Sequence, residues 1–228
     1  MNRAKASPDL RTGVPEVRGL YAITPDESDT AVLLRKVRKA LAGGARIVQY
    51  RNKTADTGLK RKQGAALLAL CRAERVPLVV NDDVDLALEL GADGVHLGRD
   101  DLPVAAARTR LGEAKLLGVS CYDRFELAVD AREAGADYVA FGSAFPSVTK
   151  PGAPRAPLSL YRDAKARLGL PIVAIGGITG ENASALIAAG ADAVAVISDL
   201  FDAPDVERRA RQLARLFSAH DVEVRPAV

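Results

Sequence analysis

Aromatic side chains are scarce in this chain, at 4% of its 228 residues, and tryptophan is absent. Proteins that bind nucleic-acid bases by stacking need aromatic platforms, so the composition argues against that class. No apolar run is long enough to span a membrane. The two cysteines, Cys71 and Cys121, lack the spacing of a metal site, and we expect free thiols in a reducing cytoplasm.

Histidine is also scarce. His96 falls inside an expected strand, where we interpret it as a core or supporting residue, and His220 lies near the C-terminus. Without an obvious histidine base, a reaction that depends on charge stabilisation fits better than general acid–base catalysis. The formal net charge is +3, with both signs interspersed. We therefore expect a solvated surface, with neither nucleic acid nor a membrane as partner.

A phrase of Gly-Ala leading into a β-branched run recurs after helix-like stretches, and its copies begin at Gly44, Gly91, Gly135 and Gly190. Each copy is typical of a helix that ends at glycine and leads into a buried strand. Further apolar runs lie at residues 18–23, 76–80, 115–119 and 170–174. Eight strands alternating with helices predict an α/β fold, a single-domain (β/α)8 TIM barrel.

We expect the barrel domain to span residues 14–220, between a disordered tail at 1–13 and a second tail at 221–228. The first residues lack the apolar segment of a secretion signal, so we expect a cytoplasmic protein. The expected helices include Thr30–Gly43, Val84–Leu90 and an amphipathic one over about 205–217. Whether the chain forms a homo-oligomer is left open by the sequence.

In such barrels the active site lies at the C-terminal ends of the strands. Asp82 and Asp101 follow the third and fourth strands, which are neighbours in the barrel. Carboxylates there suit Mg²⁺, which keeps several waters and bridges substrate phosphates. The alternative is that each carboxylate caps the helix that follows. Asp83, Asp85 and Asp100 lie close enough to be confused with the two ligand candidates.

Three cations, Arg51, Lys53 and Lys150, follow strands at the same end of the barrel. Cations beside a metal-binding pair indicate a highly charged ligand such as pyrophosphate. The alternative is that they are ordinary solvated charges. Gln49 and Asn81 add neutral hydrogen-bonding groups, and Gln49 weakens that alternative because an amide inside a strand must find partners.

The seventh and eighth strands end in Gly176-Gly177 and Ile197-Ser198, the usual place for a phosphate in this fold. A tight turn is the alternative for the glycines. The hydroxyls of Ser120 and of the segment Ser147-Val148-Thr149 are suited to bind phosphate oxygens or to orient a heteroaromatic ring. The alternative is that they are loop hydroxyls in contact with solvent.

Taken in order, these strand ends resemble the thiamine phosphate synthase family from about Leu20 to Phe201. The matching motifs are Gln49-x-Arg51-x-Lys53, Asn81-Asp82, Gly94-Val95-His96-Leu97-Gly98 with Asp101, Gly118-Val119-Ser120, Phe145-Pro146-Ser147-x-Thr149-Lys150, Ile175-Gly176-Gly177-Ile178 and Ile197-Ser198. Tyr50 and Asn52 replace the Leu and the acidic residue that are common in the family, and Ser147 stands where Thr is usual.

The resemblance implies a transferase of thiamine biosynthesis that joins hydroxymethylpyrimidine pyrophosphate to thiazole phosphate and releases pyrophosphate. It assigns the pyrimidine pyrophosphate to Gln49, Tyr50, Arg51, Asn52, Lys53, Asn81, Ser120 and Lys150. It assigns the thiazole phosphate to Ser147, Val148, Thr149, Gly177, Ile197 and Ser198, and Mg²⁺ to Asp82 and Asp101. We expect Lys150, Arg51 and Ser120 to act catalytically in a dissociative reaction, in which pyrophosphate leaves before the thiazole nitrogen attacks.

Two other functions stay open. A thiazole tautomerase shares the barrel and the thiazole phosphate site, but is expected to carry histidine two residues after the serine of strand five, where this chain has Tyr122. A non-catalytic barrel that binds a phosphorylated ligand would not need the full set of carboxylates and cations. Whether the thiazole substrate is a carboxylated tautomer is also open.

Overall fold

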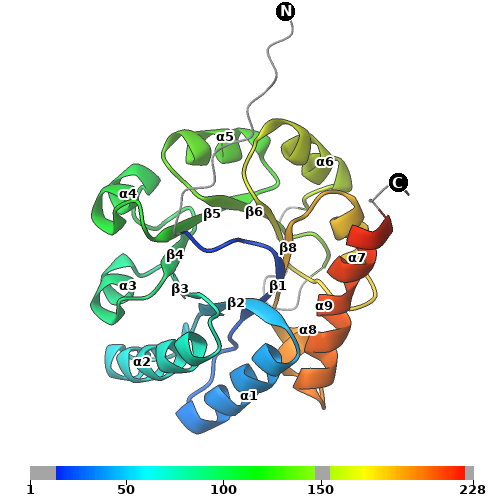
Figure 1. Cartoon of the computed structure of the whole chain (residues 1–228). Coiled ribbons are helices and arrows are strands. Elements are labelled where there is room, and N and C mark those ends of the chain that lie inside the picture. The colour runs from blue at the N-terminus through cyan, green and yellow to red at the C-terminus, as the bar shows by residue number, and fades with distance from the viewer. Residues whose placement is uncertain (1–13, 147–154, 224–228) are drawn as a thin grey trace, which may run out of the picture.

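The computed structural model describes residues 14–146 and 155–223. Eight parallel strands close into a barrel in chain order, with helices around it (Figure 1). The strands are β1 (Gly19–Ile23), β2 (Ala45–Tyr50), β3 (Leu78–Asn81), β4 (Gly94–Leu97), β5 (Leu116–Tyr122), β6 (Tyr138–Phe141), β7 (Ile172–Ile175) and β8 (Ala193–Val196). The predicted TIM barrel is therefore confirmed.

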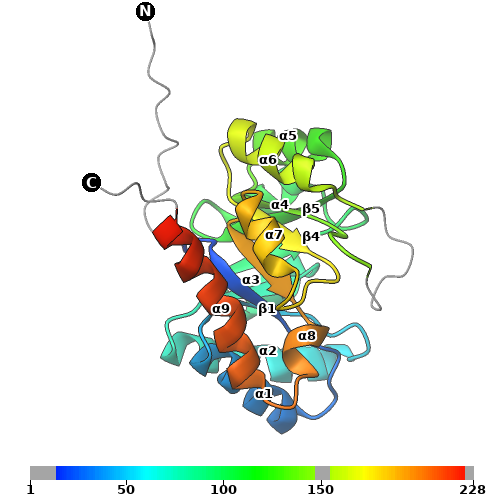
Figure 2. The same cartoon turned by 90° about the vertical axis from the view of Figure 1, so that its right-hand side faces the viewer.

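Between the strands lie α1 (Thr30–Ala42), α2 (Thr57–Ala73), α3 (Val84–Leu90), α4 (Val104–Leu111), α5 (Phe125–Glu133), α6 (Leu158–Arg167) and α7 (Ala183–Ala188). Two helices follow β8, the short α8 (Ser198–Phe201) and the long α9 (Val206–Glu223). The last helix runs beside α1 and α7 (Figure 2). It is longer than expected and passes residue 220, where we predict the barrel domain to end.

The recurring Gly-Ala phrase owes its form to local chemistry. Gly91 and Gly135 adopt φ of 69° and 95°, a left-handed conformation that favours glycine and ends the helix. In three copies the residue two positions after the glycine is aspartate, and its carboxylate accepts a backbone N–H at the start of a neighbouring strand. The pairs are Leu78 N to Asp93 Oδ2 (2.8 Å), Leu117 N to Asp137 Oδ2 (2.8 Å) and Ile172 N to Asp192 Oδ2 (2.9 Å). The repeat thus fixes strand starts at the N-terminal face, opposite the expected site.

Alternation along the strands divides the core into two layers. Inward-facing side chains such as Tyr21, Ile47, Val79, Leu116 and Tyr138 fill the barrel. Outward-facing ones pack against the helices in a second, larger cluster. Side chains of inward parity near the strand ends therefore face the mouth of the barrel.

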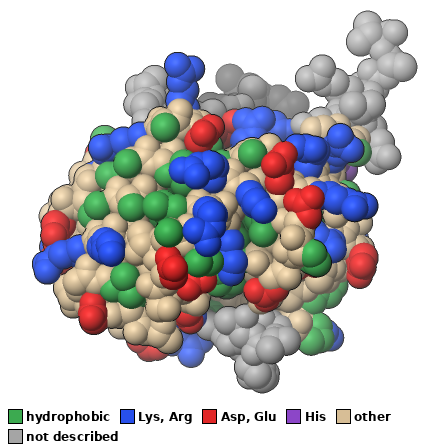
Figure 3. Space-filling view, turned by 90° about the horizontal axis from the view of Figure 1, so that it is seen from below, with side chains coloured by type: hydrophobic (Ala, Val, Ile, Leu, Met, Phe, Trp, Pro, Cys, Tyr) green, Lys and Arg blue, Asp and Glu red, His purple; other side chains and the backbone are tan. Residues whose placement is uncertain are grey.

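The outer surface carries basic and acidic side chains in a mixed arrangement over the face seen in Figure 3, as expected for a solvated surface. In the described part of the chain no helix combines the length and apolarity needed to cross a membrane. Cys71 and Cys121 are buried free thiols, and burial raises the pKa of each to about 12.

Candidate active site

A cavity of about 500 Å³ opens at the C-terminal ends of the strands, and every strand contributes to its wall. The strand residues that line it include Ile23, Gln49, Asn81, His96, Ser120, Ala140, Ile175 and Val196. Of the predicted site residues, Gln49, Arg51, Lys53, Asn81, Asp82, Ser120, Gly177, Ile197 and Ser198 line this cavity. Ser147, Val148, Thr149 and Lys150 lie outside the described residues.

The two predicted metal ligands lie together. Asp82 adopts φ of 65° directly after β3, and its carboxyl group lies close enough to that of Asp101 for the two to share a proton. Burial and the neighbouring Asp82 raise the pKa of Asp101. The backbone N of Gly98, which donates to Asp101 Oδ2 at 2.6 Å, lowers this pKa but does not outweigh them. Burial would raise the pKa of Asp82 as well, but Lys53 Nζ, 2.7 Å from its Oδ2, and Asp101 bring it below its usual value. The pair has the chemistry of a cation site.

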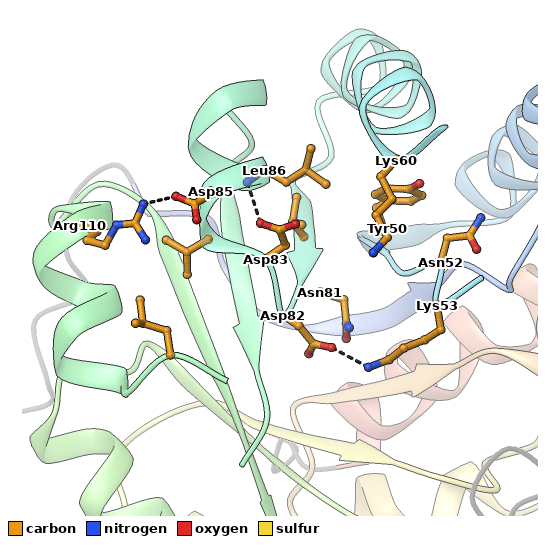
Figure 4. A pocket seen from close by; sticks show the side chains of 13 residues that line it. Tyr50, Asn52, Lys53, Lys60, Asn81, Asp82, Asp83, Asp85, Leu86 and Arg110 are labelled. Atoms are coloured by element: carbon orange, nitrogen blue, oxygen red, sulfur yellow. Dashed lines mark hydrogen bonds and ion pairs between the residues drawn. The ribbon is translucent and has the colours of Figure 1, made fainter. Parts of the chain in front are cut away.

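Helix capping does not explain either carboxylate. The residue that caps α3 is Asp83, whose Oδ1 accepts from Leu86 N at 2.9 Å, and the residue at the start of α4 is Pro103. Figure 4 shows Asp83 turned toward α3 while Asp82 faces Lys53. Its neighbour Asp85 pairs with Arg110 on α4. Asp83 and Asp85 therefore have structural partners of their own.

The cations after β2 are held by the loop after β1. Arg51 Nη1 donates to Asp26 Oδ1 at 3.1 Å, and the same oxygen accepts from Lys53 N at 2.7 Å. Thr24 Oγ1 lies 2.8 Å from both the backbone N and the backbone O of Arg51. These hydrogen bonds hold the loop after β2 in place, so Arg51 and Lys53 are positioned before any ligand binds.

A hydrogen-bonded relay crosses the barrel under the cavity. Gln49 Nε2 donates to Tyr21 OH at 2.9 Å, and Tyr21 OH lies 2.8 Å from Tyr138 OH. His96 Nδ1 lies 3.1 Å from Tyr138 OH, and His96 Nε2 lies 2.8 Å from Ser120 Oγ. Gln49, His96 and Ser120 line the cavity, whereas both tyrosines are buried below it. His96 is therefore the buried supporting residue that the sequence predicted.

The glycines after β7 pack against the loop after β6. Gly177 adopts φ of 65°, and a Cβ there would lie 2.3 Å from Pro146 O and 2.6 Å from Phe145 O. Gly176 and Ser143 meet in the same way, since a Cβ on Gly176 would lie 2.5 Å from Ser143 Oγ. A side chain at position 177 would therefore push this loop aside at the cavity wall.

Comparison with known proteins identifies the family. A sequence profile described as thiamine monophosphate synthase matches residues 20–200, nearly the whole barrel. The chain belongs to this family. A thiamine-phosphate synthase from Methylobacillus flagellatus is 57% identical over 209 residues, covering 91% of this chain and 99% of the relative. One from Chromobacterium violaceum is 58% identical over 205 residues, covering 90% and 99%. A solved thiamine phosphate pyrophosphorylase from Pyrococcus furiosus superimposes with a TM-score of 0.80 at 35% identity, covering 88% of this chain and 96% of that one.

Tyr50 and Asn52, where the chain departs from residues common in the thiamine phosphate synthase family, do not line the central cavity. Tyr50 has outward parity, and its OH donates to Gln63 Oε1 at 3.0 Å. Asn52 is buried, donates to Glu27 O at 2.8 Å and to Gln63 Oε1 at 3.0 Å, and accepts from Ala55 N. Both side chains hold the loop after β2 against α2, and they also line a second pocket of about 420 Å³ beside Lys53, Asn81 and Asp82 (Figure 4). Their contact with substrate stays a prediction.

Sequence reasoning missed four residues of this family member's site. Tyr21 and Tyr138 belong to the relay, and their only sequence signal is inward parity in a barrel with few aromatics. Arg99 and Tyr122 both line the cavity, with the guanidinium carbon 4.6 Å from the ring centroid. Arg99 adds a cation at the mouth, which its position two residues before Asp101 does not by itself reveal.

Proposed function

We propose that the protein condenses 4-amino-2-methyl-5-hydroxymethylpyrimidine pyrophosphate with thiazole phosphate to give thiamine phosphate and pyrophosphate. Membership of the family and high identity to curated relatives make it a thiamine phosphate synthase, a transferase of thiamine biosynthesis. The observation that carries the finer proposal is that Asp82 and Lys53 meet on the cavity wall beside Arg51, with Asp101 adjacent to Asp82.

The carboxylate pair fits Mg²⁺. Two adjacent carboxylates, one of which has its pKa raised by burial and by the other, would gain from a divalent cation bound to them. In the described part of the chain there is no cluster of three His, Cys, Asp or Glu side chains for a metal, so waters and substrate phosphate oxygens would complete the shell. When bound there, Mg²⁺ supplies positive charge opposite the departing pyrophosphate.

The protein's own residues then position the partners and stabilise charge. Arg51 and Lys53 place their cations where negative charge grows on the leaving pyrophosphate, and we assign Lys150 to the same task. Gln49 and Ser120 orient the pyrimidine ring, whose amino group stabilises the methylene cation left by ionisation. Gly177, Ile197 and Ser198, with the segment Ser147-Val148-Thr149, hold the thiazole phosphate so that its ring nitrogen faces that carbon.

Small molecules are the proposed partners, and a cytoplasmic location is the proposed setting. Tyr122 speaks against the tautomerase alternative, since no histidine follows Ser120 by two residues. The carboxylate pair speaks against a passive phosphate sensor, because binding one phosphate ester does not need a metal-binding pair beside two cations.

One experiment separates these functions. The purified protein is incubated with both synthase substrates and Mg²⁺, and thiamine phosphate and pyrophosphate are measured. Stoichiometric appearance of both products supports the synthase. Isomerisation of a thiazole phosphate without condensation would instead identify a tautomerase, and binding without turnover would identify a sensor.

A further inference from the structure

We propose that the buried relay Gln49–Tyr21–Tyr138–His96–Ser120 fixes opposite hydrogen-bonding character at its two ends, so that Gln49 offers an acceptor and Ser120 a donor to the pyrimidine. Tyr138 is the positioning residue, since it joins the two halves without lining the cavity. The inference rests on the proposed function for the identity of the ligand, an aminopyrimidine that carries both a donor amino group and acceptor ring nitrogens.

The order of donors follows from counting protons. Burial raises the pKa of Tyr21 to about 12 and that of Tyr138 well above its usual value, so each is a phenol with one proton to donate. Tyr21 OH already accepts from Gln49 Nε2. Its own proton is therefore donated to Tyr138 OH, 2.8 Å away, and the proton of Tyr138 is donated to His96 Nδ1. An undonated phenol proton at this depth would be costly.

The tautomer of His96 determines the direction of its hydrogen bond to Ser120 at the cavity wall. With Nδ1 accepting, neutral His96 carries its ring proton on Nε2, which donates to Ser120 Oγ at 2.8 Å. The hydroxyl proton of Ser120 is then available to a ligand. At the other end the amide of Gln49 has used one N–H, and Oε1 is the acceptor it can offer.

Turning the amide of Gln49 over would reverse every bond in the relay. Oε1 would accept from Tyr21, the proton of His96 would lie on Nδ1, and Ser120 would present an acceptor. Each direction of the relay thus pairs one orientation of the Gln49 amide with one state of the Ser120 proton, and reversing one reverses the other. A ring with a donor and an acceptor at the matching places is bound in one orientation, whereas its 4-oxo analogue meets a mismatch at one end.

The sequence makes room for this relay at one position. Gly118 on β5 lies in register with Tyr138 on β6, and a Cβ at 118 would lie 2.0 Å from Cζ of that tyrosine. The Tyr138 ring stacks on His96 with centroids 5.6 Å apart and meets the ring of Tyr21 edge-on at 6.1 Å. Packing thus aims the hydroxyl of Tyr138 at both partners before any ligand binds.

Nitrogen NMR of the ligand-free protein tests the polarity directly. The chain has two histidines, so His220→Gln identifies the signals of His96. We expect the Nε2–H tautomer, with Nδ1 as the unprotonated nitrogen, and loss of that single tautomer in Tyr138→Phe. A ring protonated on Nδ1, or on both nitrogens, overturns the proposal. Because no substrate is present, this result does not depend on whether the proposed function is right.

Substrate discrimination tests the consequence. Tyr138→Phe keeps the ring and removes the central hydroxyl, and we expect the preference for the 4-amino over the 4-oxo pyrimidine pyrophosphate, as a ratio of kcat/KM, to fall about tenfold. KM for thiazole phosphate stays unchanged. Tyr161→Phe is the matched control, because it removes another buried hydroxyl, which donates to Phe141 O at 2.9 Å outside the relay. Equal loss of discrimination in both variants would overturn the coupling.

Discussion

Lys53 Nζ lies 2.7 Å from Asp82 Oδ2, so a cation assigned to the pyrophosphate is held, in the free protein, by a carboxylate assigned to Mg²⁺. The side chain of Lys53 is 56% exposed and that of Asp82 29% exposed, so solvent weakens their attraction. We therefore expect Mg²⁺ and substrate together to replace this pair.

This competition predicts the behaviour of Lys53→Gln. Without the ammonium, Asp82 is free for the metal, and we expect Mg²⁺ to bind the substrate-free variant about twofold to fivefold more tightly, as calorimetry measures. Turnover falls at the same time, because a cation facing the leaving pyrophosphate is lost. Weaker Mg²⁺ binding in Lys53→Gln would contradict the exchange.

The metal assignment predicts that EDTA abolishes activity and that Mg²⁺ restores it. Asp82→Ala and Asp101→Ala should lose turnover while their circular dichroism spectra stay native. In the same two variants, calorimetry should show no binding of Mg²⁺ in the presence of pyrophosphate. A variant that lost turnover only through an indirect structural effect would still bind the metal. Full activity after EDTA treatment would remove the metal from the mechanism.

The matched control for these variants is Asp83→Ala. Its side chain caps α3, so the variant should lose about 1 kcal/mol of unfolding free energy and keep its turnover. Asp100→Ala should likewise be mild. Loss of turnover in Asp83→Ala equal to that in Asp82→Ala would indicate that the loop as a whole, and not one carboxylate, matters.

Gly177→Ala should affect the thiazole half of the reaction. Its Cβ would lie 2.3 Å from Pro146 O, so the loop after β6 must move, and we expect KM for thiazole phosphate to rise about tenfold or more with little change for the pyrimidine pyrophosphate. Gly169→Ala has a similar φ of 71° but nothing within 4 Å of the added carbon, so it isolates the cost of backbone strain. Equal changes in both KM values would contradict the assignment.

Local patterns predicted most of the fold and the mouth of the site, for identifiable reasons. The Gly-Ala-Asp phrase encodes a helix end and a strand start within a few residues, as Gly91 to Asp93 illustrate. The sequence assigned the metal to Asp82 through its strand-end position and the family motif, but the reason that Asp82 and not Asp83 faces the cavity, a positive φ at Asp82, is visible only in the structure. The bond between Tyr21 and Tyr138 joins residues 117 positions apart, and only closure of the barrel brings them together.

Stability should depend on a buried ion pair at the other face of the barrel. Arg108 Nη2 lies 2.5 Å from Asp137 Oδ2, and the same side chain donates to Gly112 O, Lys115 O and Gly135 O. Arg108→Ala should lose about 3 kcal/mol of unfolding free energy in urea titrations. Arg211→Ala, which removes an exposed pair with Glu207 on α9, should lose less than about 0.5 kcal/mol. Similar losses in both would mean that burial does not decide the effect.

The dissociative mechanism predicts how the rate depends on electron-withdrawing substituents of the pyrimidine ring. If pyrophosphate leaves before the thiazole nitrogen attacks, positive charge develops on the methylene carbon, and an electron-withdrawing ring substituent destabilises the transition state. Replacing the 2-methyl group by trifluoromethyl should then slow single-turnover formation of thiamine phosphate by orders of magnitude, with little change in binding of the pyrimidine pyrophosphate. Arg51→Ala should slow the same step, because the ordered guanidinium meets charge that grows on the leaving group. A weak or inverted dependence on the substituent would instead indicate direct displacement by the thiazole, in which little cationic charge accumulates.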